Sequence, residues 1–383
     1  MLIINANIKT MEHEDFENGY IAVSDGKIQS VGPMSEAPPD EDVYDAQGMT
    51  LYPGFIDAHC HLGMWEDGLG FEGDDGNEET DPVTPQLRAI DAINPLDRTF
   101  REAVEGGITT VLTGPGSANP IGGQWAAIKT RGRRIDDMIL KEPVGMKFAL
   151  GENPKSVYND KNQAPNTRMA TAALIREQLK KAQRYLEDLE RIEEDEDCDE
   201  PEYDIKCEAL LPVLRKEQKA FFHAHRADDI FTAVRIAKEF DLDLVLCHCT
   251  EGHLIADLLK EEGYGVIAGP ILGDRSKPEL RNLERSGLAK LSREGIQAGL
   301  CTDHPETPIQ YLPLCAGVAV GAGLGYGEAL KAITLYPARI VGIDDRVGSI
   351  KAGKDADFVL YEGDPLSPYY HPKQVFINGE KCL

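Results

Sequence analysis

Short apolar runs alternate with longer amphipathic stretches through the middle of the chain. The apolar runs predict eight strands, at residues 51–61, 108–113, 125–130, 145–150, 220–225, 242–249, 265–270 and 297–303. Residues 171–189, 227–240 and 254–262 repeat apolar positions with helical spacing and predict helices between the strands. Strands that alternate with helices are typical of an α/β protein with a parallel sheet. Eight such strands favour a closed (β/α)8 TIM barrel over an open doubly wound sheet.

Both ends of the chain carry a different pattern, in which short strand-like runs are separated by turn residues. Such runs fill the first fifty residues, where Asp25-Gly26 predicts a hairpin turn, and they return at 357–361 and 374–379. We therefore expect the two termini to pair into one small β-sandwich-like module. The predicted division is 1–50 and 341–383 for the module and 51–340 for the barrel.

The composition narrows the classes of function. The formal net charge of −26 argues against a protein that binds nucleic acid through its phosphate backbone. The eight cysteines are scattered without a Cys-x-x-Cys pair, which is typical of reduced thiols in a cytoplasmic protein. The first residues have neither the regions of a signal peptide nor the length of a membrane span. We expect a cytoplasmic protein that acts on a small molecule and does not bind a membrane. The sequence does not decide whether it forms a homo-oligomer.

Polar residues mark the carboxyl-terminal ends of five predicted strands. They are His59 and His61, Lys147, His223 and His225, His248, and Asp303. Strand ends of a barrel meet at one face, so we expect these groups to lie close together. Imidazole nitrogens and carboxylate oxygens are the ligands of a divalent metal such as Zn²⁺.

The strand period decides which side chains share a face. His59 and His61 lie two residues apart, so they should point to the same side while Cys60 points to the other. By the same rule Cys247 and Cys249 should face away from His248, and we do not expect them to be metal ligands.

Two longer motifs give the chain a resemblance to a known family. Residues 53–61 (PGFIDAHCH) resemble the opening motif of the amidohydrolase superfamily of metal-dependent hydrolases. Residues 336–339 (YPAR) and 347–357 (VGSIKAGKDAD) are similar to the closing segment of that family. The imidazolonepropionase-like and prolidase-like members are the closest in character.

The resemblance implies a role for each polar strand end. His59, His61 and Asp303 would bind the first metal, and His223 and His248 would bind a second metal or share a single one. Asp303 would also be the general base, which takes a proton from metal-activated water and passes it to the leaving amine. His225 would either polarise the substrate carbonyl or support a ligand by a hydrogen bond.

Two-metal members of the family bridge the ions with a carboxylated lysine, and Lys147 is at the expected position. Carboxylation converts an ammonium group into an anion with two oxygens, which suits a bridge between cations. Glu152 is a rival bridging carboxylate. The alternative for Lys147 is an outward side chain paired with an acid.

Other residues are candidates for the substrate pocket. The glycine-rich segment 113–123 includes Asn119 and Gly123, and its glycines allow a ligand to approach the backbone closely. Arg226 and Arg275 could hold a substrate carboxylate, or could form structural ion pairs. The long connection at 62–98 is either a lid over the site or a surface loop.

The expected reaction is hydrolysis of a C–N amide bond in a cyclic amide, an N-acyl amino acid or a dipeptide. The alternative is deamination of a heterocycle, but deaminases of this superfamily place a glutamate shortly after the fifth-strand histidine, and residues 224–228 (AHRAD) contain none. A non-catalytic binding protein on the same fold is a further alternative, which the intact ligand set argues against.

Overall fold

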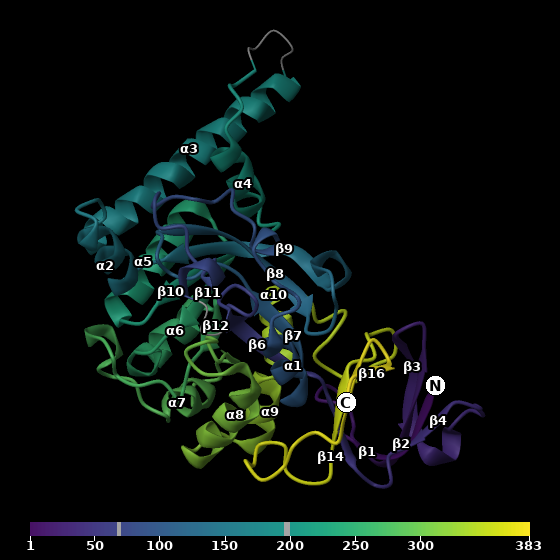
Figure 1. Ribbon diagram of the computed structural model, residues 1–383. Coiled ribbons are helices and arrows are strands. Elements are labelled where there is room, and N and C mark those ends of the chain that lie inside the picture. The colour runs from purple at the N-terminus through teal and green to yellow at the C-terminus, as the bar shows by residue number, and fades with distance from the viewer. Residues whose placement is uncertain (67–69, 195–199) are drawn as a thin grey trace.

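A barrel and a smaller strand-rich module make up the computed structural model, which describes residues 1–66, 70–194 and 200–383 (Figure 1). The barrel sheet runs in sequence order from β6 to β13. Its strands are β6 (Phe55–Cys60), β7 (Ile108–Thr113), β8 (Ile121–Lys129), β9 (Ile139–Ala149), β10 (Lys219–Ala224), β11 (Leu244–His248), β12 (Gly265–Ala268) and β13 (Gly299–Leu300). The predicted α/β barrel with a module built from both termini is confirmed.

The third barrel strand departs from the predicted parallel arrangement. β8 runs antiparallel to both β7 and β9, whereas the other neighbouring strands of the barrel are parallel. Residues 114–120 and 130–138 connect β8 to its neighbours, and both connections are shorter than the roughly dozen residues that a parallel crossover requires. Because β8 is reversed, the segment before it lies at the face where the other strands end.

Irregular hydrogen bonds join the last strand to the first, since β13 is only two residues long. The backbone N–H of Asp303 donates to the carbonyl of His59 at 3.1 Å, and the N–H of His61 donates to the carbonyl of His304 at 2.9 Å. These two bonds lie beyond the end of β13 and include His59, His61 and Asp303, which the sequence marks as metal ligands.

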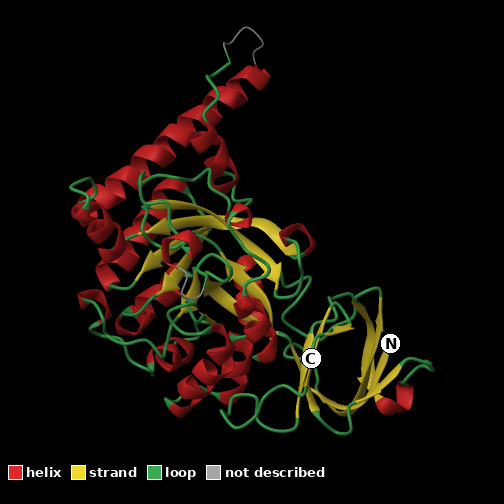
Figure 2. Ribbon diagram, in the orientation of Figure 1, coloured by secondary structure: helices red, strands yellow, loops and turns green. Residues whose placement is uncertain are grey.

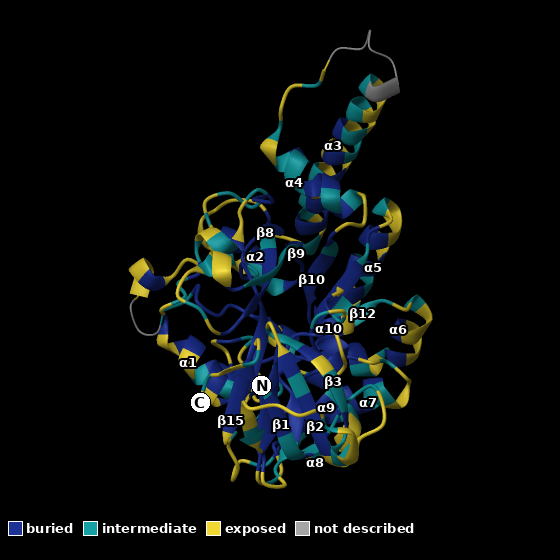
Figure 3. Ribbon diagram, turned by 90° about the vertical axis from the view of Figure 1, so that its right-hand side faces the viewer, coloured by how far each residue is buried: buried dark blue, intermediate teal, exposed yellow. Residues whose placement is uncertain are grey.

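Helices surround the barrel sheet (Figure 2). They are α1 (Arg98–Glu105), α2 (Glu152–Asp160), α3 (Arg168–Glu194), α4 (Ile205–Leu214), α5 (Ala227–Phe240), α6 (Ala256–Glu262), α7 (Gly287–Arg293), α8 (Leu312–Gly321), α9 (Tyr326–Ala332) and α10 (Leu335–Val341). The three predicted helices correspond to α3, α5 and α6. The far part of α3 projects from the barrel beside α4 (Figure 3). Among the described residues no helix is both long and apolar enough to cross a membrane.

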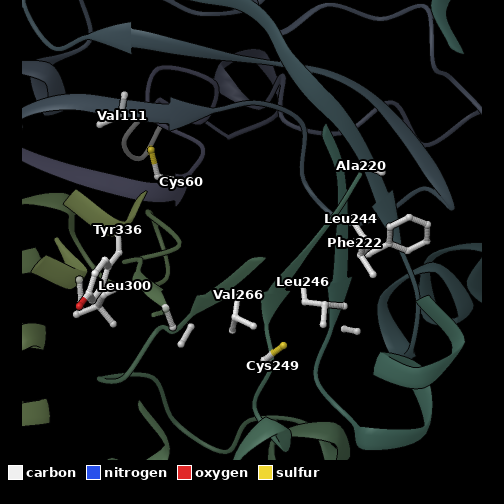
Figure 4. Packing of buried hydrophobic residues seen from close by; sticks show 14 of the residues in the cluster. Cys60, Val111, Ala220, Phe222, Leu244, Leu246, Cys249, Val266, Leu300 and Tyr336 are labelled. Carbon is white, nitrogen blue, oxygen red and sulfur yellow. The ribbon is translucent and has the colours of Figure 1, made fainter. Parts of the chain in front are cut away.

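Alternation along the strands divides the apolar core into two clusters. Phe222 and Leu246 pack outward in the larger cluster between the sheet and the helices (Figure 4). Phe221 and Cys247 belong to a second cluster with residues from the other barrel strands, including Trp125 of β8, and this cluster fills the barrel interior. The seven cysteines in the described part of the chain are free, as predicted, and Cys198 lies outside it.

The terminal module is a sheet with the strand order β16-β15-β14-β5-β1-β2-β3, in which β4 also pairs with β1. Its strands are β1 (Leu2–Ile8), β2 (Phe16–Ser24), β3 (Lys27–Pro33), β4 (Val43–Asp45), β5 (Thr50–Pro53), β14 (Phe358–Tyr361), β15 (Gln374–Ile377) and β16 (Glu380–Lys381). Asp25 and Gly26 form the predicted hairpin turn, with φ values of 51° and 72°. The predicted strand 51–61 is two strands, because β5 pairs with β14 in the module and β6 pairs with β7 in the barrel.

A buried cluster of charged residues connects the two sheets. Lys129, at the end of β8, forms ion pairs with Asp357 and, at 2.9 Å, with Asp355 of the segment before β14. Asp355 also contacts Arg346 and Lys27. All three members of the Lys129 group are almost inaccessible to solvent, so each charge depends on its partners rather than on water.

We therefore expect Lys129→Met to lower the free energy of unfolding by about 3 kcal/mol, because it leaves two buried carboxylates short of a cation. Urea unfolding of the variant and the parent measures the difference. Lys373→Met is the matched control, since Lys373 pairs with Glu362 at an exposed position where an ion pair contributes about 1 kcal/mol or less. Equal losses in the two variants would contradict the role given to the buried cluster.

Candidate metal centre

Two groups of potential metal ligands lie at the end of the barrel where β6, β10, β11 and β13 terminate. One group is His59, His61 and Asp303, and the other is His223, His225 and His248. Within each group the donor atoms all lie within 4.8 Å of one another. The structure thus brings together every histidine that the sequence marked at a strand end, and it places His225 among them.

In the first group the two imidazoles face one carboxylate. The Nε2 atoms of His59 and His61 lie 3.2 and 3.4 Å from Oδ1 of Asp303. The other ring nitrogen of His61 lies 2.7 Å from the carbonyl oxygen of Gly114, so this nitrogen carries the proton when the ring is neutral. Nε2 of His61 then presents a lone pair to a carboxylate, an arrangement that a bound cation would make favourable.

In the second group each ring is oriented through Nδ1, which leaves Nε2 free. Nδ1 contacts Ser117 Oγ at 2.9 Å in His223, Thr250 Oγ1 at 2.7 Å in His225 and the Gly269 carbonyl at 2.9 Å in His248. The Nε2 atoms of His223 and His248 are buried and have no hydrogen-bond partner. Buried polar atoms are seldom left unpaired, so these nitrogens are positioned as metal ligands with their supporting contacts already made.

Left-handed backbone at two strand ends turns ligands toward the site. Cys247 faces the barrel interior, so strict alternation would point His248 outward, and the prediction that Cys247 lies on the opposite face from the site is wrong. His248 has a φ of 71° and Asp303 a φ of 55°. Such values are unfavourable for non-glycine residues and often occur at functional sites.

Burial sets the charge of the site. It lowers the pKa of His248 to about 4 and the pKa values of His59, His223 and His225 well below the ordinary range. Burial acts in the opposite direction on Asp303, but its contacts with His248 and with the first histidine pair outweigh this effect and hold its pKa well below normal. At neutral pH these four imidazoles are therefore uncharged, and the carboxylate of Asp303 is ionised.

Lys147 points inward from β9 and is completely buried. Its Nζ lies 3.5 Å from Nε2 of His59 and 4.9 Å from the centroid of the Trp125 ring. Burial lowers the pKa of this amine. The sequence alternative of an outward lysine paired with an acid does not describe the structure.

A cavity of about 820 Å³ opens over the site, within the size range of small-molecule pockets. The connection at 62–98 contributes Trp65, Asn77 and Glu79 to its wall, although residues 67–69 lie outside the described part of the chain. The ring of Trp65 lies 4.7 Å from that of His61. The described part of the connection therefore forms part of the cavity wall.

The four residues proposed for substrate binding lie away from this wall. Asn119 uses its amide to contact Glu78, Thr84 and Tyr158. Gly123 lies against the backbone of Leu87. Arg226 pairs with Asp228, and Arg275 donates to the carbonyl of Leu283. Glu152, the rival bridge, belongs to neither ligand group among the described residues, and its backbone N–H donates to Glu279.

The sequence reasoning missed Lys277 and Glu279, which follow β12. Lys277 is the one lysine or arginine among the described residues that line the cavity. Glu279 is buried, with Oε1 3.7 Å from Nε2 of His225. Residues 224–228 contain no glutamate, but Glu279 supplies a carboxylate near the end of β10. No periodic pattern surrounds Glu279, so the sequence offered no signal for it.

Comparison with known proteins places this architecture in a family. The sequence profile of the Amidohydrolase family matches residues 211–382. Amidohydrolase tasK of Hapsidospora irregularis is 33% identical over 391 aligned residues, which cover 95% of this chain but only 39% of that protein. An imidazolonepropionase of Shewanella oneidensis is 25% identical over 422 residues, covering 94% of this chain and 91% of that protein. The crystal structure of an amidohydrolase from Thermotoga maritima is 42% identical, covers 100% of this chain and 99% of that chain, and superposes with a TM-score of 0.96.

The chain belongs to the amidohydrolase family. It is a hydrolase that acts on C–N bonds of small molecules, and amidohydrolases generally use a divalent metal. The residues present fit that requirement, because both ligand groups supply imidazole nitrogens and the first adds a carboxylate. The unpaired Nε2 atoms of His223 and His248 are the observation that carries this fit.

Metal binding should stabilise the fold, because the ligands lie far apart in sequence and are assembled only in the folded chain. We expect Zn²⁺ at a hundred times its dissociation constant to raise the free energy of unfolding by about 2.7 kcal/mol. His248→Ala should lose much of this gain, whereas His371→Ala, at an exposed position, should retain it. Urea unfolding with Zn²⁺ and with a chelator measures both. A zinc response that is unchanged in the His248 variant would contradict the assignment.

Proposed function

We propose that this amidohydrolase cleaves an amide bond with water, using Asp303 as the general base. The observation that carries the proposal is the convergence of Asp303 with His59, His61 and the three imidazoles of the second group below one cavity. One or two zinc ions held by these residues would supply Lewis acidity, which polarises a carbonyl group and makes water a stronger nucleophile.

Asp303 has the position and the charge of a proton carrier. Its carboxylate lines the cavity and is held ionised by the groups around it. It accepts a proton from the attacking water as the C–O bond forms and passes that proton to the leaving nitrogen as the C–N bond breaks. A carboxylate that shares a metal ion with His59 and His61 would be held in place during both transfers.

The charges around the cavity favour a substrate without a carboxylate. Arg226 and Arg275 are engaged elsewhere in the chain. The ammonium group of Lys277 is held by Asn153 at 2.6 Å and by Glu279 at 2.7 Å. The wall also contains Asp274 and Glu306, which would repel an anion. Of the three substrate classes, we therefore favour a cyclic amide over an N-acyl amino acid or a dipeptide.

The proposed role of Lys147 is a carboxylated bridge between the two ligand groups. Its lowered pKa favours the neutral amine, which adds to the carbon of CO₂ and releases one proton. The product is an anion near His59, where a positive ammonium group would oppose metal binding.

We expect the metal-loaded protein, prepared in ¹³C-labelled bicarbonate, to give one carbamate signal in its carbon NMR spectrum. Lys147→Gln should lack the signal because an amide does not add to CO₂. A parent spectrum without the signal would contradict the bridge and leave the two ligand groups unbridged by Lys147.

Asp303→Asn should lower kcat/KM by at least about 10³ on the best amide found, because the amide side chain cannot accept the proton of water. A panel of cyclic amides, N-acyl amino acids and dipeptides, assayed on zinc-loaded protein, identifies that substrate. Asp241→Asn is the control: Asp241 is exposed beyond α5 with a φ of 54°, which asparagine also adopts. Turnover that survives in the Asp303 variant would exclude it as the base.

A further inference from the structure

We infer that Glu279 and His225 are metal ligands, which together with His223 and His248 make the second position a site of three imidazoles and one carboxylate. The inference rests on the proposed function only in that both require metal at this end of the barrel. It goes beyond the ligand set expected from the sequence, in which His225 either polarised the substrate carbonyl or supported a ligand by a hydrogen bond, and Glu279 had no role.

The spacing of the donor atoms supports a shared ion. Oε1 of Glu279 lies 3.7 Å from Nε2 of His225 and 4.0 Å from Nε2 of His223. These distances exceed those of hydrogen bonds. Ligand atoms bound about 2.1 Å from one tetrahedral ion are separated by roughly 3.4 Å. Glu279 lies outside the ligand group as it stands, and a movement of its carboxylate toward the rings would bring it to the same ion, where a carboxylated Lys147 would be a fifth ligand.

His225 is arranged like the other two histidines of its group. Its ring is buried, its Nδ1 is fixed by Thr250, and its Nε2 faces the same centre. The rings of His225 and His248 are stacked with centroids 4.8 Å apart, and the ring of His223 lies 4.6 Å from that of His225. His225 also lines the cavity with His223, and its ring is supported through Nδ1 in the same way as the rings of His223 and His248.

The surroundings of Glu279 hold its carboxylate in this place. Glu279 lies in a short 3₁₀ turn, Pro278–Leu280, and is 1% exposed. Its Oε2 accepts a hydrogen bond from the backbone N–H of Glu152 at 2.9 Å. Gly151 precedes that N–H with a φ of 84°, and a Cβ atom on it would lie 2.7 Å from Oε2. Only glycine both adopts this backbone and leaves room for the carboxylate.

Lys277 completes the environment of the carboxylate. Its ammonium group lies 2.7 Å from Oε1 of Glu279 and is also held by Asn153. A carboxylate oxygen has two lone pairs, and metal-bound carboxylates commonly accept hydrogen bonds from neighbouring groups. The contact with Lys277 is an ion pair, and Oε1 is buried without a hydrogen-bond partner among the described residues, so its lone pairs are available to a metal ion.

Zinc titration of chelator-stripped protein tests the inference with Glu279→Gln, and Glu306→Gln is the matched control. Glu306 lines the same cavity but is exposed. Competition with a chromophoric chelator gives the affinity of each position, and elemental analysis gives the stoichiometry. We expect Glu279→Gln to weaken one zinc position by more than about 100-fold, beyond the 10- to 100-fold typical of outer supporting groups, and to leave the other position unchanged. Affinities in Glu279→Gln equal to those in Glu306→Gln would overturn the inference.

Crystals of the parent protein soaked with zinc give a second measurement that does not depend on the variant folding. An anomalous peak about 2.0–2.2 Å from both Glu279 and His225 supports the inference. A zinc ion at this position that lacks one or both of these ligands overturns it. The amide panel remains a separate experiment. If zinc binds through Glu279 but no amide is cleaved, the proposed function fails and this inference stands.

Discussion

The junction between β6 and β13 determines where every group of the first ligand set lies. Backbone hydrogen bonds pair His59 with Asp303 and His61 with His304. Below them the carboxylate of Asp57 accepts hydrogen bonds from the backbone N–H of His59 and from the N–H and hydroxyl of Thr302. Burial raises the pKa of Asp57 to about 7, so these hydrogen bonds offset only part of the cost of burying its charge. The contacts that close the barrel are thus the contacts that assemble His59 and His61 around Asp303.

The second ligand group depends on loops rather than on strand pairing. Nδ1 of His223 contacts a residue of the segment before β8, and Nδ1 of His248 donates to Gly269 after β12. Because β8 is antiparallel, the 114–120 segment lies at the ligand end of the barrel, where it also provides the Gly114 carbonyl to His61. A Cβ on Gly114 would lie 2.0 Å from the Trp125 ring, so the close approach of this segment requires glycine. The reversed strand and the orientation of two histidines are therefore one structural feature.

Much of the site could be predicted because the strand ends of a barrel converge at one face, and this convergence does not depend on the helices between the strands. That rule was sufficient for His59, His61, His223 and Asp303, although the pairing of β6 is irregular between Asp57 and Cys60 and Asp303 has a left-handed φ. His248 was found for the same reason, although a left-handed φ that no pattern reveals is needed to turn it inward. The antiparallel β8 and the position of Glu279 depend on connection lengths and on irregular loop structure. Connections and irregular loops carry no hydrophobic period, so the sequence does not predict their structure. For the same reason the sequence did not reveal that Arg226 pairs with Asp228 or that Arg275 contacts the carbonyl of Leu283.

The charges of the two ligand groups can be compared with those of the metal ions that they would hold. Each group offers imidazole nitrogens, which bind a metal without adding charge, and with Glu279 included each has one carboxylate. A divalent ion in each position would leave about one positive charge per group, and a carboxylated Lys147 between them would reduce the total to one. That remaining charge lies at the base of a cavity whose wall carries Glu79, Asp274 and Glu306. In the proposed amide hydrolysis, an oxygen that gains negative charge would be stabilised at the metal end of the cavity, and the carbonyl of the substrate would therefore point inward.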